Sequence, residues 1–173
     1  MNIELYTERL KLRPLQMADL DALYEYTGDT EWITYMLFLP HESRQEAEKF
    51  LREAVAEWAK EDPSYYEFGM ELDGKLIGTM SAYKEDGGKE IEFGWVIHKA
   101  YKGQGYVTEA ALAVKKFAIE CLKPVRLTAH CDKRNSASAK VMERIGLPFA
   151  GEGTREYRSG EKAAELAYVE WLN

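Results

Sequence analysis

Cysteine is scarce in this chain, and so are long apolar runs and an excess of positive charge. Cys121 and Cys131 are the only cysteines among 173 residues. Their spacing fits neither a zinc motif nor the framework of a disulfide-rich secreted domain. We therefore expect no metal site and no disulfide, and we expect a reduced, cytoplasmic protein. Because a free cysteine is usually a small buried side chain, neither thiol is expected to be a nucleophile.

The apolar runs are short as well. No segment reaches the roughly 18 apolar residues that a membrane-spanning helix needs, and the first residues lack the apolar core of a secretion signal. The net charge is −7, whereas nucleic-acid binding requires a basic surface. These features argue against a membrane or a nucleic-acid partner. The acidic balance is compatible with a cationic substrate such as an amine, although many soluble proteins are mildly acidic.

Apolar residues are nevertheless numerous enough for one core, at 46% of the chain. The length suits a single domain over residues 1–173, and no repeat or linker-like tract divides it. Hydrophobic periodicity predicts helices over residues 18–28, 43–60, 106–122 and 135–145. It predicts strands over residues 3–13, with an interruption near Thr7–Glu8, in a three-strand meander over 65–98, and over 125–131, 147–154 and 163–172. The order β-α-α-β-β-β-α-β-α-β-β indicates a mixed α/β (α+β) fold.

A glycine-containing turn joins the last strand of the meander to the helix at 106–122. Gly103 and Gly105 allow the backbone to approach a ligand closely. The first N–H groups of the following helix have no partner within it and lie at the positive end of its dipole, so this turn is suited to phosphate or pyrophosphate. A P-loop would need Gly-Lys-Ser/Thr, and a dinucleotide site would need glycine in place of Thr108. Coenzyme A is the remaining ligand, and a purely structural loop is the alternative.

Several segments resemble the GNAT superfamily of N-acetyltransferases. Lys102-Gly103-Gln104-Gly105-Tyr106-Val107 is similar to the pyrophosphate loop of that family, Arg/Gln-x-x-Gly-x-Gly/Ala, with Lys102 and Val107 as departures. Thr7-Glu8-Arg9-Leu10-Lys11-Leu12-Arg13 and Gly105-Tyr106-Val107-Thr108-Glu109-Ala110 resemble segments of the branch that contains the ribosomal-protein-alanine N-acetyltransferases. Asn135-Ser136-Ala137-Ser138 with Glu143-Arg144-Ile145-Gly146-Leu147 resembles a helix of the same branch.

This resemblance implies a twisted, mostly antiparallel sheet of about seven strands flanked by four helices. It implies acetyl-CoA as co-substrate, no metal, and direct attack by a primary amine in a ternary complex. The amine would belong to a protein N-terminus or to a small molecule. The implied cofactor-binding residues are Val96, Ile97, Lys102, Gly103, Gln104, Gly105, Tyr106, Val107, Thr108 and Asn135. The alternative is a GNAT fold that binds acetyl-CoA without turnover, as a sensor or interaction module, and a homodimer is left open.

Glu92 is the candidate base, in the middle of the third meander strand. Strand alternation places it on the face opposite Ile91 and Phe93. Its position matches the strand-borne glutamate of the family, which often acts through water. Glu90 shares its face and is the second candidate. The alternative for Glu92 is a solvated or ion-paired strand residue.

Ser138 is the second catalytic candidate. Many family members carry a tyrosine acid at the position of Met142, and a thioether cannot donate a proton. The resemblance therefore points to Ser138, which would orient a water or the sulfur. The resemblance also implies that the strand of Glu92 splays from its neighbour near Val96 and Ile97, which frees backbone groups for the thioester.

Three aromatic residues lie in the loop where GNAT proteins shape the acceptor pocket: Trp32, Tyr35 and Phe38. His130 shares a strand face with Thr128, and we expect it to be a structural histidine rather than a site residue.

Overall fold

The computed structural model describes residues 3–32, 34–36, 42–157 and 160–172. The strands are β1 (Leu5–Tyr6), β2 (Lys11–Pro14), β3 (Tyr65–Leu72), β4 (Lys75–Glu85), β5 (Glu90–Ile97), β6 (Arg126–Asp132), β7 (Phe149–Glu156) and β8 (Lys162–Trp171). The helices are α1 (Leu20–Thr27), α2 (Arg44–Trp58), α3 (Tyr106–Phe117) and α4 (Ser136–Arg144). Short helical turns are η1 (Met17–Asp19), η2 (Asp86–Gly88), η3 (Lys99–Tyr101) and η4 (Ala118–Leu122).

In the described part of the chain, eight strands form one open sheet in the order β1-β2-β3-β4-β5-β6-β8-β7. Every neighbouring pair is antiparallel except β5 and β6. The predicted mixed α/β class is confirmed. The sheet has one strand more than the expected seven because the interruption near Thr7–Glu8 separates β1 from β2.

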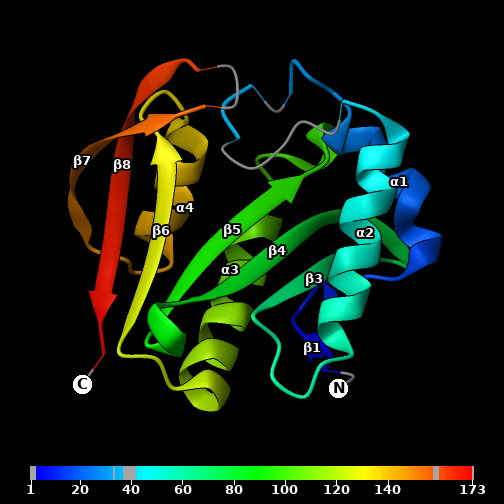
Figure 1. Ribbon diagram of the computed structural model, residues 1–173, viewed down its shortest axis with the longest axis horizontal. Coiled ribbons are helices and arrows are strands. Elements are labelled where there is room, and N and C mark those ends of the chain that lie inside the picture. Colours follow the sequence, from blue (N-terminus) through cyan, green and yellow to red (C-terminus); the bar gives the residue numbers. More distant parts are fainter. Residues whose placement is uncertain (1–2, 33, 37–41, 158–159, 173) are drawn as a thin grey trace.

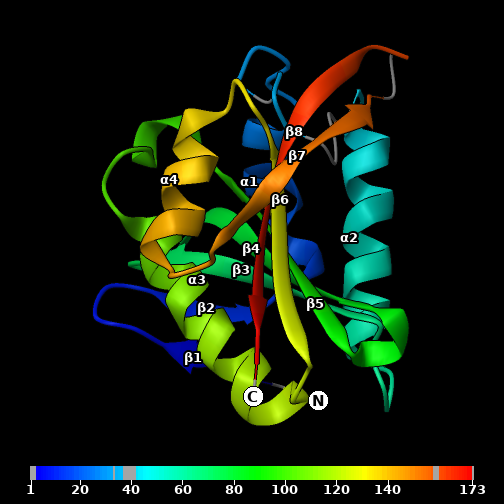
Figure 2. The ribbon, with the colours of Figure 1, turned by 90° about the vertical axis from the view of Figure 1, so that its left-hand side faces the viewer.

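The helices lie in two layers, with α1 and α2 on one face of the sheet and α3 and α4 on the other (Figures 1 and 2). Helix α2 is capped by Ser43, whose Oγ accepts a hydrogen bond from the Glu46 N–H at 3.2 Å. Its buried stripe is Ala47, Leu51, Ala54 and Trp58. On the other face, α3 buries Ala110, Ala111, Val114 and Phe117 in the main core.

Strands β5 and β6 separate along their length, and this separation shapes the site. They pair in parallel from Glu90–Arg126 to Phe93–Ala129. Beyond that point β5 continues to Ile97 and β6 to Asp132 with no further pairing between them. Figure 1 shows the two strands diverging toward the end of the sheet where α4 begins. The splay implied by the resemblance is therefore present.

Candidate active site

The N-terminus of α3 is open toward the splay. Gly103 and Gly105 have left-handed φ angles of +73° and +84°, which glycine adopts without a steric penalty. Gly105 occupies the N-cap position and has no side chain with which to cap the helix. The first hydrogen bond of the helix runs from the Glu109 N–H to the Gly105 carbonyl. The N–H groups of Tyr106, Val107 and Thr108 therefore remain for an external acceptor.

A cavity of about 560 Å³ extends from this helix end along the splay. It is lined by eight of the ten predicted cofactor-binding residues: Ile97, Lys102, Gly103, Gly105, Tyr106, Val107, Thr108 and Asn135. Ser138, Trp32 and Tyr35 line it as well. Phe38 lies outside the described residues. The structure thus brings the glycine turn, the end of β5 and the start of α4 around one space.

Val96 and Gln104 are not among the described lining residues of this cavity. The His98 N–H donates to the Ile77 carbonyl of β4 at 2.8 Å. Hydrogen-bonded pairs alternate along an antiparallel ladder, so the N–H of Val96 also points to β4, whereas those of Trp95 and Ile97 point into the splay. Gln104 is turned toward the protein, because its carbonyl accepts from Arg9 Nη1 at 2.9 Å.

Three positive side chains face the cavity, and no carboxylate is among its described lining residues. Lys102 comes from the glycine turn, whereas Lys140 and Arg144 come from α4. Lys140 and Arg144 were not predicted as site residues. Their spacing of four residues places them on one helix face, but only the docking of α4 shows that this face borders the cavity. With the α3 dipole, these charges favour a polyanionic ligand such as a diphosphate.

The start of α4 contributes polar groups to the lining of the large cavity. Asn135 Oδ1 accepts a hydrogen bond from the Ser138 N–H at 3.1 Å, which confirms Asn135 as the N-cap. Its Nδ2 remains as the group that can donate to a ligand. Ser138 lines both the large cavity and a smaller one that also contains Trp95, His130 and Cys131.

Glu92 lies on the opposite sheet face from α3 and is engaged with two basic side chains. Its Oε1 is 3.1 Å from His130 Nδ1 and 4.0 Å from Arg155 Nη2. The hydrogen bond with Glu92 raises the pKa of His130, although the burial of the ring opposes this shift. His130, not Glu92, is among the residues that line the small cavity beside Ser138. The predicted role of Glu92 as base stays a prediction. The alternative candidate, Glu90, is bound by Arg126 and Thr128.

The two sequence segments that resemble one branch of the family contact each other. Glu109 of α3 accepts hydrogen bonds from Thr7 Oγ1 at 2.6 Å, from the Arg9 N–H at 2.8 Å and from Arg9 Nε at 2.7 Å. Partial burial raises the pKa of Glu109, but these hydrogen bonds outweigh it and hold the pKa below its ordinary value. The β1–β2 connection therefore fixes the first turn of α3.

Residues 3–32, 34–36, 42–157 and 160–172 contain neither a cluster of metal-ligating side chains nor a membrane-spanning helix. No group of three or more His, Cys, Asp or Glu side chains gathers there as a metal site would require. Within the same residues, no helix has the length and apolar character needed to cross a membrane.

Comparisons with known proteins agree with this geometry. The sequence profile of the acetyltransferase (GNAT) domain matches residues 9–148. The uncharacterized N-acetyltransferase YnaD of Bacillus subtilis (strain 168) is 30% identical over 147 residues, which cover 84% of this chain and 82% of that protein. A crystal structure of a GNAT-family acetyltransferase from Bacillus anthracis superposes with a TM-score of 0.85 at 27% identity, covering 98% of both chains.

The fold is also shared with RimL, a ribosomal L7/L12 alpha-N-protein acetyltransferase. That structure superposes with a TM-score of 0.87 at 18% identity and covers 99% of this chain and 96% of its own. The resemblance read from the glycine turn and the flanking segments is confirmed. The open N-terminus of α3 and the splay of β5 from β6 agree with the family profile, and we conclude that this chain belongs to the GNAT family and is an N-acetyltransferase.

Proposed function

We propose that this chain transfers the acetyl group of acetyl-CoA to a primary amine by direct attack in a ternary complex. The observation that carries the proposal is the large cavity, which runs from the open N-terminus of α3 along the splay between β5 and β6. Its ends differ chemically: one presents bare N–H groups and positive side chains, and the other presents strand backbone and Ser138. A long ligand with a diphosphate at one end and a thioester at the other fits this division.

In this proposal, the N–H groups of Tyr106, Val107 and Thr108 bind the diphosphate, and Lys140 and Arg144 neutralise its charge. Asn135 donates to the arm that leads to the thioester. The N–H groups of Trp95 and Ile97 face the splay, so we assign them the role that the sequence analysis gave to Val96 and Ile97. They stabilise the negative charge that develops on the carbonyl oxygen during attack.

Glu92 and Ser138 both take part in the proposed proton transfer, but Glu92 acts through His130 and not as the base itself. Because its hydrogen bond with Glu92 raises the pKa of His130, Glu92 favours the protonated imidazole, the form that can act as an acid. His130 lines the small cavity beside Ser138, which is the side where the sulfur leaves. His130 then donates its proton to the departing thiolate, directly or by way of Ser138. Glu92 is in this scheme a positioning residue that controls the protonation of His130.

The acceptor is a primary amine that approaches from the face of α1 and α2, opposite the α3 side of β5. A protein N-terminus and a small-molecule amine are the two acceptor classes that the resemblance implies. The acidic net charge of −7 favours a cationic acceptor in either case.

The test is thiol release from acetyl-CoA in the presence of a panel of amines and N-terminal peptides. Acetyl-CoA, ATP and NAD are compared in parallel by thermal shift, with acetyl-CoA expected to be the stabilising ligand. Amine-dependent thiol release supports the proposal. Binding of acetyl-CoA without release for any amine would instead support the alternative of a sensor or interaction module.

A further inference from the structure

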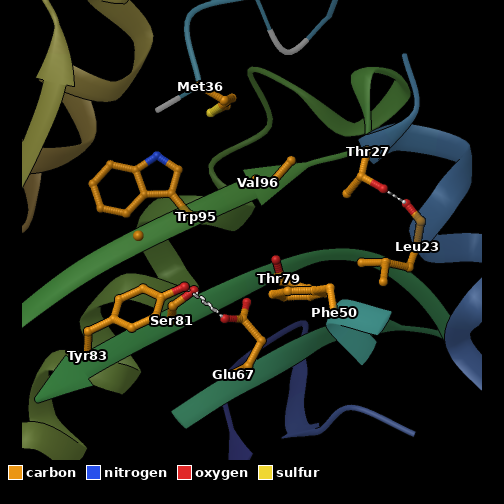
Figure 3. A pocket seen from close by; sticks show the side chains of 11 residues that line it. Leu23, Thr27, Met36, Phe50, Glu67, Thr79, Ser81, Tyr83, Trp95 and Val96 are labelled. Carbon is orange, nitrogen blue, oxygen red and sulfur yellow. Dashed lines mark hydrogen bonds between the residues drawn. The ribbon is translucent and has the colours of Figure 1, made fainter. Parts of the chain in front are cut away.

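A third cavity, of about 50 Å³, lies between the sheet and the helices α1 and α2. Figure 3 shows its side chains, which come from α1, α2 and the strands β3, β4 and β5. Leu23, Phe50, Met36 and Trp95 supply apolar walls. The polar groups gather at the sheet, where the carboxylate of Glu67 lies beside Ser81 and Tyr83 (Figure 3). The cavity is therefore apolar at its sides and acidic at one end.

Glu67 is a buried carboxylate with hydroxyl partners and no cation. Its side chain is fully buried, and Oε2 accepts hydrogen bonds from Ser81 Oγ at 2.6 Å and from the Tyr83 hydroxyl at 3.4 Å. Within the described residues, no Lys, Arg or His forms an ion pair with it. A buried carboxylate without a positive partner is costly unless a cation arrives or the group is protonated.

The titratable groups around Glu67 are phenols. Its charge acts on Tyr26 of α1, Tyr65 of β3 and Tyr83 of β4. Desolvation raises the pKa of Glu67 to about 7, against the lowering effect of the hydroxyl hydrogen bonds. The carboxyl group therefore exchanges a proton within the physiological range of pH.

Gly94 lies where this cavity adjoins the small cavity beside Ser138. It lines both the Glu67 cavity and the small cavity that contains Ser138 and His130. A Cβ at position 94 would lie 3.7 Å from Tyr83 Cε2 and 3.8 Å from Ser81 Oγ, in the space that leads to Glu67. Met36 and Trp95 line all three cavities. Because residue 94 has no side chain, the Glu67 cavity and the small cavity beside Ser138 adjoin at this position.

We propose that this cavity receives the acceptor amine and that Glu67, reached past Gly94, binds the ammonium group and takes up its proton, directly or through one water. The inference rests on the proposed function and names the acceptor site within it. The group bound is a primary amine on an unbranched aliphatic chain. The volume of about 50 Å³ accommodates an ammonium with its adjoining methylenes, and the walls are apolar.

In the overall reaction one proton must leave the ammonium group before attack, and Glu67 can accept it. Glu67 takes one proton from the ammonium and leaves a neutral amine, whose lone pair forms the C–N bond as the C–S bond breaks. The departing thiolate receives a proton from His130, which recovers one from the acetylated nitrogen, directly or through water. Glu67 returns its proton to solvent when the product leaves. Glu67 thus accepts a proton before the attack, and His130 donates a proton to the leaving group.

The experiment compares wild-type protein with Glu67→Gln and Gly94→Ala, using butylamine as the probe amine. For Glu67→Gln we expect kcat/KM for the amine to fall by about 100-fold or more. We also expect the decline of wild-type kcat/KM on the acid side, centred near pH 7, to disappear. The dissociation constant of acetyl-CoA should be unchanged. Butylamine should raise the melting temperature of wild-type protein but not that of the variant.

Gly94→Ala tests the place where the two cavities adjoin without touching the carboxylate. Its Cβ makes only ordinary contacts, so the variant should fold, bind acetyl-CoA and keep the acid-side pH dependence. Its kcat/KM for butylamine should fall about tenfold. Wild-type turnover and an unchanged pH profile in Glu67→Gln would overturn the inference, as would a clear preference of wild-type protein for peptide N-termini over aliphatic amines. A wild-type protein without activity toward any amine would contradict the proposed function itself.

Discussion

At position 105 the backbone requires glycine, and the ligand site depends on that requirement. The φ angle is +84°, and the nearest atom to an added Cβ is Arg9 Nη2 at 3.4 Å. We predict that Gly105→Glu abolishes acetyl-CoA binding. A carboxylate there would occupy the diphosphate position and repel it, and the left-handed backbone would add strain of about 1–2 kcal/mol. Calorimetric titration with acetyl-CoA measures the effect.

The matched control is Gly87→Glu. Gly87 also has a left-handed φ, of +64°, and nothing lies within 4 Å of a Cβ built on it. It belongs to η2, the turn between β4 and β5, and is not among the described residues that line the large cavity. This variant carries similar strain and the same charge but should bind acetyl-CoA normally. Equal binding by both variants would place the diphosphate site elsewhere.

Glu92 has a different kind of effect, because its carboxylate sets the protonation of His130. We predict that Glu92→Gln lowers kcat roughly 10- to 100-fold near pH 8 with little change in acetyl-CoA affinity. Glu92 raises the pKa of His130. Without that charge, the pKa of His130 falls toward 6.5 and the acid form is lost at lower pH.

The pH profile separates this role from a structural one. In wild-type protein, activity should decline on the alkaline side as His130 loses its proton. In Glu92→Gln that decline should begin at lower pH, while the decline on the acid side is retained. A variant with the wild-type profile and turnover would remove Glu92 from the mechanism.

Among the secondary-structure elements, the start of α3 is held by a residue that lies about a hundred positions earlier in the sequence. Arg9 of the β1–β2 connection pairs with Glu109, donates to the Gln104 carbonyl at 2.9 Å and lies over the Tyr106 ring at 4.3 Å. These contacts hold the glycine turn in the conformation that presents its N–H groups.

We predict that Arg9→Ala weakens acetyl-CoA binding about fivefold, because the turn must then be ordered when the ligand binds. Calorimetric titration measures the affinity, and hydrogen exchange should show faster exchange at Gly103–Tyr106. Arg52→Ala is the control, since Arg52 pairs with Glu48 on the exposed surface of α2. An unchanged affinity in Arg9→Ala would show that the turn is rigid without the contact.

Strand β5 shows how much of an element the sequence can specify. The alternation of Ile91, Glu92 and Phe93 places Glu92 on the opposite face from the two apolar side chains, and the burial of Ile91 and Phe93 agrees with it. The sequence does not reveal that pairing with β6 stops at Phe93, because separation of strands depends on what packs between them. For this reason the backbone N–H of Trp95 was missed and that of Val96 was predicted.

At the scale of the whole molecule, burial of Glu67 makes stability depend on pH. Desolvation raises the pKa of this carboxyl to about 7 from an ordinary value of 4.5. Between these values the folded state binds a proton that the unfolded state has lost. The free energy of unfolding contributed by this group therefore falls as pH rises from about 4.5 to about 7 and is constant above that.

We predict that Glu67→Gln removes this dependence. Relative to wild-type protein, the variant should gain about 3 kcal/mol of unfolding free energy between pH 4.5 and pH 8, the equivalent of the pKa shift. Urea denaturation of both proteins at several pH values measures the difference. A difference that does not vary with pH would mean that Glu67 ionises in the folded protein as it does in the unfolded chain.

The same scale explains which residues were missing from the sequence analysis. Glu67 lies between Tyr66 and Phe68, and its alternation places it on the other face of β3. Whether that face meets water or helices is decided by the docking of α1 and α2. Helix α1 ends 40 residues before Glu67, and α2 ends 9 residues before it. Lys140 and Arg144 were missed for the same reason, because the docking of α4 gives their exposed face its function. The expectations of a cytoplasmic location and of a possible homodimer remain predictions.

The sequence by itself determined the local structure, which is the positions of the strands, the helices and the glycine turn. Period-2 and period-3.6 patterns placed the strands and helices, and glycines at 103 and 105 marked a turn that only a left-handed backbone forms. Tertiary structure alone decided the splay of β5 from β6, the pairing of Glu92 with His130 and the burial of Glu67. Each of these depends on contacts between elements distant in the chain, and desolvation and strand separation have no local signature in a sequence.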